Sequence, residues 1–242
     1  MAKRPTDGKC VHCLRENVPR NWDHVLPESW YPDSTLRDLE KWKIPSCIPC
    51  NSELGRIEED LLMMFALCVD PKDPRSQGLF RRTRESLDPS CARNDRDRRA
   101  RDSRRIKLLQ NMTLARDSLA KNGIVGIYPG LPAPTEEQKE SGIPMFIPTE
   151  WIRRMCEKFI RGHVFLNDGL FIEPPFTVAF YAVDDEGASE LRATLRTHGE
   201  EYPLGEALLF KRIKVHDNGF HAAYEIQIWG QVTMFASVSE PT

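Results

Sequence analysis

The stretch that decides the fold begins at Cys10-Val-His-Cys13, continues through Trp22-Asp-His-Val-Leu-Pro27 and ends at Cys47-Ile-Pro-Cys50-Asn51. Each Cys-x-x-Cys pair can form a tight turn that presents two sulfur atoms, and two such turns complete the tetrahedral site that zinc prefers. We therefore expect these four cysteines to hold one structural zinc ion. Because they would fill its coordination sphere, we expect His12 to be an exposed turn residue. Redox-active or merely buried thiols are the alternative.

The composition limits the classes of protein to which the chain can belong. Of its 242 residues 40% are hydrophobic and 29% are charged, which predicts one or two small domains with a polar linker. The formal net charge of -2 argues against a uniformly basic nucleic-acid binder, so attraction to phosphate would need a local patch. No run approaches the roughly 20 apolar residues of a membrane span, and residues 1–5 lack the apolar core of a signal peptide. We expect a cytoplasmic protein in which Cys68, Cys91 and Cys156 are free thiols.

The apolar pattern predicts an α+β protein in three segments. Residues 1–75 should form a zinc-bound module of short extended stretches, followed by a helix that opens at Asn51 and ends near Leu67. Residues 76–147 should form a basic, partly helical linker that includes a stretch rich in proline and glycine. Residues 148–242 should form a small antiparallel α+β domain. Its predicted elements are a helix that opens at Thr149, strands at 176–183, 207–215, 221–229 and 232–238, and a turn at 217–219.

Three polar residues between and beside the cysteine pairs are candidates for chemistry. Asp23 and His24 lie where an extended segment would end, and Asn51 lies in the first turn of the following helix. If these ends face one another, the Asp23 carboxylate and the Asn51 carbonyl offer oxygen ligands to Mg²⁺ or Mn²⁺. His24 could then deprotonate a water molecule aimed at phosphorus. Taken singly, His24 would be interpreted as structural and Asn51 as a helix cap, but their joint placement favours catalysis.

The run from Cys10 to Leu62 resembles the HNH endonucleases that carry a zinc-knuckle version of the ββα-metal fold. The segments that carry the resemblance are Trp22-Asp-His-Val-Leu-Pro-Glu-Ser-Trp-Tyr-Pro32 and Trp42-Lys-Ile-Pro-Ser-Cys-Ile-Pro-Cys-Asn51, about the first quarter of the chain. The resemblance implies that Asp23 and Asn51 bind the catalytic metal and that His24 is the general base. The middle motif residue is usually an asparagine that orients the histidine. No asparagine lies between His24 and Cys50, and Asp38 is the nearest substitute.

Arginine is concentrated between Phe80 and Lys107, where ten arginines accompany five acidic residues. We expect this segment to neutralise backbone phosphates, which would give a salt-sensitive affinity with little sequence information. The expected contacts are Arg96, Arg98, Arg99 and Arg101. A solvated, self-paired helix face is an equally weighted alternative, because acidic residues interleave at helical spacing. In the last segment we expect Phe220, Tyr224 and Trp229 to pack within the sheet and not to stack on bases.

These features predict a metal-dependent HNH endonuclease that hydrolyses phosphodiester bonds in nucleic acid, with DNA the first choice. The resemblance implies products with a 5′ phosphate and a 3′ hydroxyl. The alternative is a non-catalytic zinc-binding module that binds nucleic acid or protein. The complete set of Asp23, His24 and Asn51 favours the enzyme, and the missing middle asparagine favours the binder. Target choice and self-association through residues 148–242 are both left open, and no membrane partner is expected.

Overall fold

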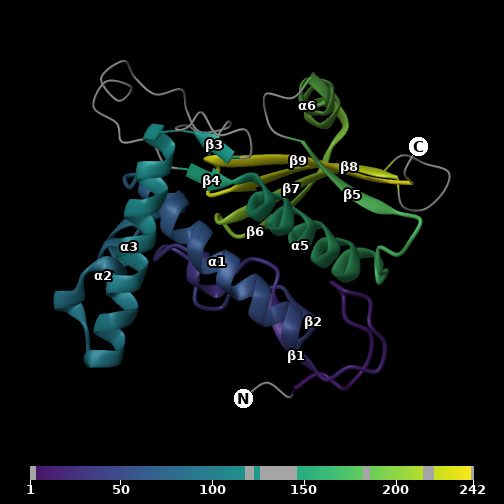
Figure 1. The fold of residues 1–242 in the computed structure, drawn as a ribbon. Helices are drawn as coiled ribbons and strands as arrows, with labels where there is room; N and C mark the ends of the chain where they lie inside the picture. The colour runs from purple at the N-terminus through teal and green to yellow at the C-terminus, as the bar shows by residue number, and fades with distance from the viewer. Residues whose placement is uncertain (1–3, 118–122, 126–145, 182–185, 215–220, 241–242) are drawn as a thin grey trace.

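The fold is mixed α+β, as the sequence predicts. Figure 1 shows the computed structural model, which describes residues 4–117, 123–125, 146–181, 186–214 and 221–240. Among these residues no helix combines the length and the apolar character needed to span a bilayer. The predicted turn at 217–219 and the stretch rich in proline and glycine at 128–144 lie outside the described residues.

The first segment forms an antiparallel strand pair followed by a long helix. Strand β1 (Arg20–His24) pairs with β2 (Lys43–Cys47), which sets Asp23 opposite Ile44, and the 3-10 helix η1 (Glu28–Trp30) lies between them in the chain. Helix α1 (Ile48–Cys68) begins directly after β2. Pro49 in its first turn favours that start, because the N–H that proline lacks would have no partner within the helix. The helix therefore begins before the predicted Asn51 and ends at Cys68, next to the predicted Leu67.

The basic segment forms two helices that lie beside α1 (Figure 1). They are α2 (Leu79–Leu87) and α3 (Asp95–Asp117), with the short 3-10 helices η2 (Pro74–Ser76) and η3 (Pro89–Cys91) before each. Arg104 Nε lies 2.5 Å from Glu59 Oε1 of α1, and Lys107 pairs with Asp60 of the same helix. Ion pairs thus connect α3 to α1, and the described part of the segment is helical at 79–87 and 95–117.

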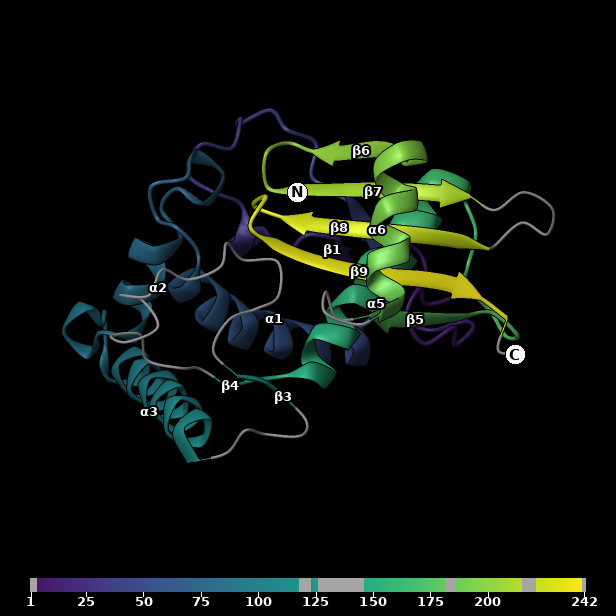
Figure 2. The same cartoon turned by 90° about the horizontal axis from the view of Figure 1, so that it is seen from above.

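The last segment contains a five-stranded antiparallel sheet with one helix on each face (Figures 1 and 2). The strand order is β5-β9-β8-β7-β6. The strands are β5 (Thr177–Tyr181), β6 (Glu200–Leu204), β7 (Leu208–Lys214), β8 (Ala222–Ile228) and β9 (Val232–Ser239). Helix α5 (Thr149–Asp168) covers the face toward α1, and α6 (Glu186–His198) covers the other. A further pair, β3 (Gly123–Val125) and β4 (Phe146–Pro148), precedes α5. The four predicted strands are present, whereas β6 and α6 were not predicted.

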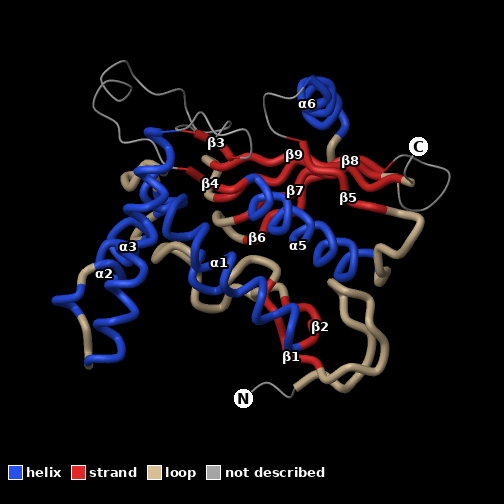
Figure 3. The backbone as a smooth tube through the Cα atoms, in the orientation of Figure 1, coloured by secondary structure: helices blue, strands red, loops and turns tan. Residues whose placement is uncertain are grey.

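Helix α5 joins the first segment to the sheet, as the tube in Figure 3 also shows. An added Cβ at Gly162 would lie 2.7 Å from Val25 Cγ2 and 3.3 Å from Ile44 Cδ1, so the backbone of α5 approaches β1 and β2 closely. Trp30 contacts the rings of Phe159 and Trp229, and Trp229 Nε1 donates a 2.7 Å hydrogen bond to the Trp30 carbonyl. Residues of the first and last segments therefore share one apolar core. The division at residues 75 and 147 stays a prediction.

The aromatic residues of the sheet are packing residues where the structure describes them. Tyr224 and Trp229 are completely buried, as expected of residues that pack within the sheet, and Phe220 lies outside the described residues. Neither buried ring can stack on a base. Nucleic acid, if it binds, must therefore contact other surfaces.

Candidate functional site

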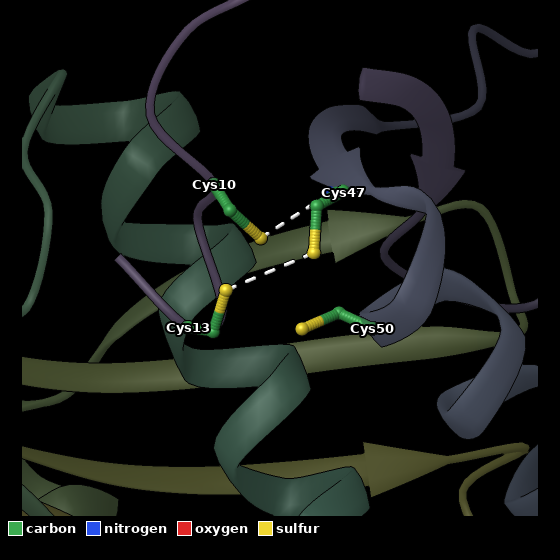
Figure 4. A group of neighbouring side chains, drawn as sticks. All are labelled: Cys10, Cys13, Cys47 and Cys50. Carbon is green, nitrogen blue, oxygen red and sulfur yellow. Dashed lines mark hydrogen bonds between the residues drawn. The ribbon is translucent and has the colours of Figure 1, made fainter. Parts of the chain in front are cut away.

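The four cysteines of the two pairs converge in space (Figure 4). Cys10 and Cys13 lie in a turn closed by the Leu14 N–H, which donates to the Cys10 carbonyl at 3.0 Å. Cys47 ends β2, and Cys50 lies in the first turn of α1. Their four Sγ atoms all lie within 4.8 Å of one another, an arrangement that could hold a metal ion.

The cysteine cluster (Cys10, Cys13, Cys47 and Cys50) fits a tetrahedral thiolate site. A tetrahedron with Zn–S bonds of about 2.3 Å requires sulfur atoms about 3.8 Å apart, and Cys13 Sγ lies 3.7 Å from Cys47 Sγ. The Cys47 N–H donates to Cys10 Sγ at 3.2 Å, which favours negative charge on that sulfur. A hydrogen bond from the Cys50 thiol is the main cause that lowers the pKa of Cys10. Zinc, when bound, would tie the loop before β1 to the start of α1.

The prediction that His12 is an exposed turn residue is wrong, because the residue is buried. Its Nε2 atom lies 3.0 Å from Asp23 Oδ2, and the two side chains are only 3% and 4% exposed. The spacing of the cysteines correctly left His12 out of the cluster. It could not show that the turn directs this ring toward a carboxylate on β1.

Asp23 is held from its other side by the last segment of the chain. Lys158 of α5 has a side chain that is 0% exposed, and its Nζ lies 2.8 Å from Asp23 Oδ1. The same Nζ is hydrogen-bonded to Glu58 of α1. We name Asp23, Glu58, Lys158 and His12 the carboxylate cluster. Sequence reasoning missed Glu58 and Lys158 as members, since Glu58 reads as an ordinary helical residue and Lys158 is 135 positions from Asp23.

The two carboxyl groups of the carboxylate cluster respond differently to burial. Burial acts to raise the pKa of Asp23, but the His12 hydrogen bond and the Lys158 charge outweigh it, so the pKa lies below its ordinary value. Burial raises the pKa of Glu58 above its ordinary value, although the charge of Lys158 opposes the change. Asp23 is therefore the carboxylate that this environment keeps ionised.

His24 has a different environment from its neighbour Asp23. Successive residues of a strand point to opposite faces, and Asp23 is buried whereas His24 is half-buried. Burial lowers the pKa of His24, while the nearby charge of Glu28 opposes that change. Its Nε2 atom is buried and has no hydrogen-bond partner among the described residues. Burial therefore favours the neutral form of the ring, and Nε2 makes no hydrogen bond to a described residue.

Asn51 and Asp38 are not drawn into the carboxylate cluster. Asn51 is half-buried in the first turn of α1, and no hydrogen bond joins it to Asp23. Asp38 is exposed in the chain between η1 and β2, and no hydrogen bond joins it to His24. The proposed ligand role of Asn51 and the bracing role of Asp38 thus have no support in the contacts of these described residues.

The Asp23 carboxylate does not fit the expected Mg²⁺ or Mn²⁺ ion. Mg²⁺ demands near-ideal octahedral geometry and keeps several waters. Here Oδ1 accepts from Lys158, Oδ2 contacts His12, and the side chain is 4% exposed. Within the described part of the chain, the cysteine cluster is the one group of three or more His, Cys, Asp or Glu residues that could hold a metal ion. No catalytic step is therefore assigned to a divalent ion at Asp23.

The four predicted phosphate contacts fall into two pairs. Arg98 lies 3.5 Å from Asp95, and Arg101 lies 3.2 Å from Asp97 and donates to the Glu85 carbonyl. Arg96 and Arg99 are exposed, with no ion pair to another described residue. Two of the four arginines are thus self-paired and two face solvent, and their contact with phosphate stays a prediction.

Searches of family models, of curated proteins and of solved structures find no match to this chain. The resemblance to HNH endonucleases therefore remains a hypothesis carried by the residues of the first segment and by their arrangement.

Proposed function

We propose that this chain is an HNH-type phosphodiesterase that acts on nucleic acid, with DNA as the first substrate to test. The observation that carries the proposal is the half-buried His24 ring, which has a lowered pKa and makes no hydrogen bond through Nε2 to a described residue. Its position at the end of β1, in a strand pair followed by α1 and bordered by the cysteine cluster, supports the resemblance.

The chemistry that this chain's own residues would perform is general base catalysis. The His24 imidazole removes a proton from a water molecule as the water oxygen attacks phosphorus. The P–O3′ bond breaks, and the 3′ oxygen departs and takes up a proton from solvent. The products are a 5′ phosphate and a 3′ hydroxyl. Zinc at the cysteine cluster would hold the strand pair and α1 together without contacting the substrate.

The test is cleavage of supercoiled plasmid by the zinc-loaded full chain, with Mg²⁺, with Mn²⁺ and with neither. His24→Ala should slow cleavage by about a hundred- to ten-thousand-fold, because it removes the base that activates water. His198→Ala is the matched control, since His198 is exposed on α6, and it should cut at the wild-type rate. A folded, zinc-loaded His24→Ala protein that cuts as fast as the wild type would overturn the proposal.

A second candidate is a non-catalytic zinc-stabilised module that binds nucleic acid or protein. It is favoured by the carboxylate cluster, because Asp23, the ligand that the resemblance requires, already pairs with Lys158 and His12. Binding of DNA in a gel-shift assay without nicking under any metal condition would favour this candidate over the enzyme.

A further inference from the structure

We infer that the Lys158 ammonium fills the cation position between Asp23 and Glu58 and excludes a divalent ion from it. Asp23 then acts as an anchor that connects the turn containing His12 to α5, and not as a metal ligand. This assignment rests on the contacts of the carboxylate cluster alone, so it holds whether or not the chain hydrolyses nucleic acid.

The contacts satisfy the charges without another ion. Lys158 Nζ donates to Asp23 Oδ1 at 2.8 Å and to Glu58 Oε1, while His12 lies against Asp23 Oδ2. One ammonium with three N–H groups thus meets two carboxylates at once. The side chains of Lys158, Asp23 and Glu58 are 0%, 4% and 16% exposed, so little water is present to screen them.

The packing of α5 fixes the ammonium in this place. Gly162 lies one helical turn after Lys158, and its backbone approaches Val25 and Ile44 so closely that an added Cβ would overlap Val25. Ile44 is the residue that faces Asp23 across the strand pair. This close contact fixes the position of α5 against the strand pair. It therefore also fixes the distance that the Lys158 side chain spans to Asp23.

A divalent ion cannot share the position with the ammonium. Mg²⁺ or Mn²⁺ would need the same carboxylate oxygens, and its charge would lie within a few ångströms of another cation in a poorly hydrated site. A cavity of about 400 Å³ between α1 and α2 is lined by Glu58 together with Gly55 and Arg82, so it reaches one of the two carboxylates. The other carboxylate, Asp23, and the Lys158 ammonium lie behind it and are almost completely buried.

The test compares Mn²⁺ binding to zinc-loaded wild type, Lys158→Met and Lys214→Met by electron paramagnetic resonance, with Tm measured in parallel. Lys214 is the matched control because it pairs with Asp168 at the half-exposed end of β7. Wild type and Lys214→Met should show no Mn²⁺ binding that depends on Asp23, so adding Asp23→Asn should leave their Mn²⁺ signals unchanged. Lys158→Met should gain one Mn²⁺ per chain, at least tenfold tighter than any wild-type binding, and its Tm should rise when Mn²⁺ is added.

The assignment is overturned by either of two results. One is a Mn²⁺ ion in the wild type that Asp23→Asn removes, a measurement that stands even if Lys158→Met fails to fold. The other is a folded Lys158→Met protein without a new Mn²⁺ site. Because the readout is binding and not cleavage, failure here is distinct from failure of the proposed hydrolysis, which plasmid nicking reports.

Discussion

The cysteine cluster and the carboxylate cluster both draw residues from the turn before β1, from the β1–β2 pair and from α1, yet their cations have different sources. The cysteine cluster gathers four sulfur ligands that could hold a metal ion taken up from solution. The carboxylate cluster receives the Lys158 ammonium from α5, so its cation is part of the chain. Ligand residues alone therefore do not define a metal site, because a distant segment can supply the charge instead.

The largest expected effect is the loss of stability when the cysteine cluster loses a ligand. Cys47→Ser should remove zinc and with it most of the roughly 10 kcal/mol or more that a structural zinc site contributes to folding. Cys91→Ser is the control, since Cys91 is exposed and outside the cluster. Elemental analysis and thermal unfolding would measure both effects. Equal zinc content and equal Tm in the two variants would show that the four cysteines do not act as one site.

Acidification sharpens the comparison through another buried group, His163, which makes no ion pair within the described part of the chain and lies near the charges of Arg212 and Asp168. His163 of α5 stacks on Phe210 at a ring distance of 4.6 Å, and burial lowers its pKa to about 3. Between that value and the ordinary 6.5, the unfolded chain binds a proton that the folded chain does not, so stability falls as pH falls below 6.5. The loss should reach about 2 kcal/mol by pH 5. Urea unfolding at several pH values should show it, and His163→Phe should flatten the curve.

The Asp23 carboxylate should pass through the same pH window unchanged. The folded pKa of Asp23 lies below its ordinary 3.8, so its stabilising contribution is present above that pH and disappears only at more acidic values. If His163→Phe loses stability between pH 7 and pH 5 as steeply as the wild type, a group other than His163 causes the acid sensitivity.

The smallest expected effect concerns the surface of α3. Arg96→Gln with Arg99→Gln should reduce the salt dependence of DNA binding by about 0.9 in slope for each lost phosphate contact. Arg98→Gln with Arg101→Gln is the matched pair, and its effect should be smaller because these arginines already pair with Asp95 and Asp97. Identical slopes for the wild type and both double variants would show that none of these four arginines contacts a DNA phosphate.

The sequence predicted what depends on short-range spacing. It predicts the cysteine pairs, the helix that follows them and the four long strands, because a pattern of neighbouring residues defines each of these elements. Edge strand β6 was not predicted, because Glu200, Glu201 and Pro203 hide the pattern of a buried strand, as is common at a sheet edge. Helix α6 was missed as well, since few of its residues are buried.

The environment of the candidate site could not be predicted in the same way. The sequence points to Asp23, but the partners of its carboxylate come from the turn at His12 and from α5. No local pattern connects β1 to a lysine 135 positions later. The lowered pKa of His24 could not be predicted either, because it follows from burial that only the folded core provides.

The span between Asp23 and Lys158 also orders events during protein synthesis. The ribosome makes the cysteine cluster, Asp23 and Glu58 long before it reaches α5, and early segments begin to fold while later ones are still being added. In that interval the two carboxylates have no internal ammonium, and they are free to meet ions from the surrounding solution. Completion of α5 then supplies a covalently attached charge to these two carboxylates, so their cation no longer depends on the ions in the surroundings.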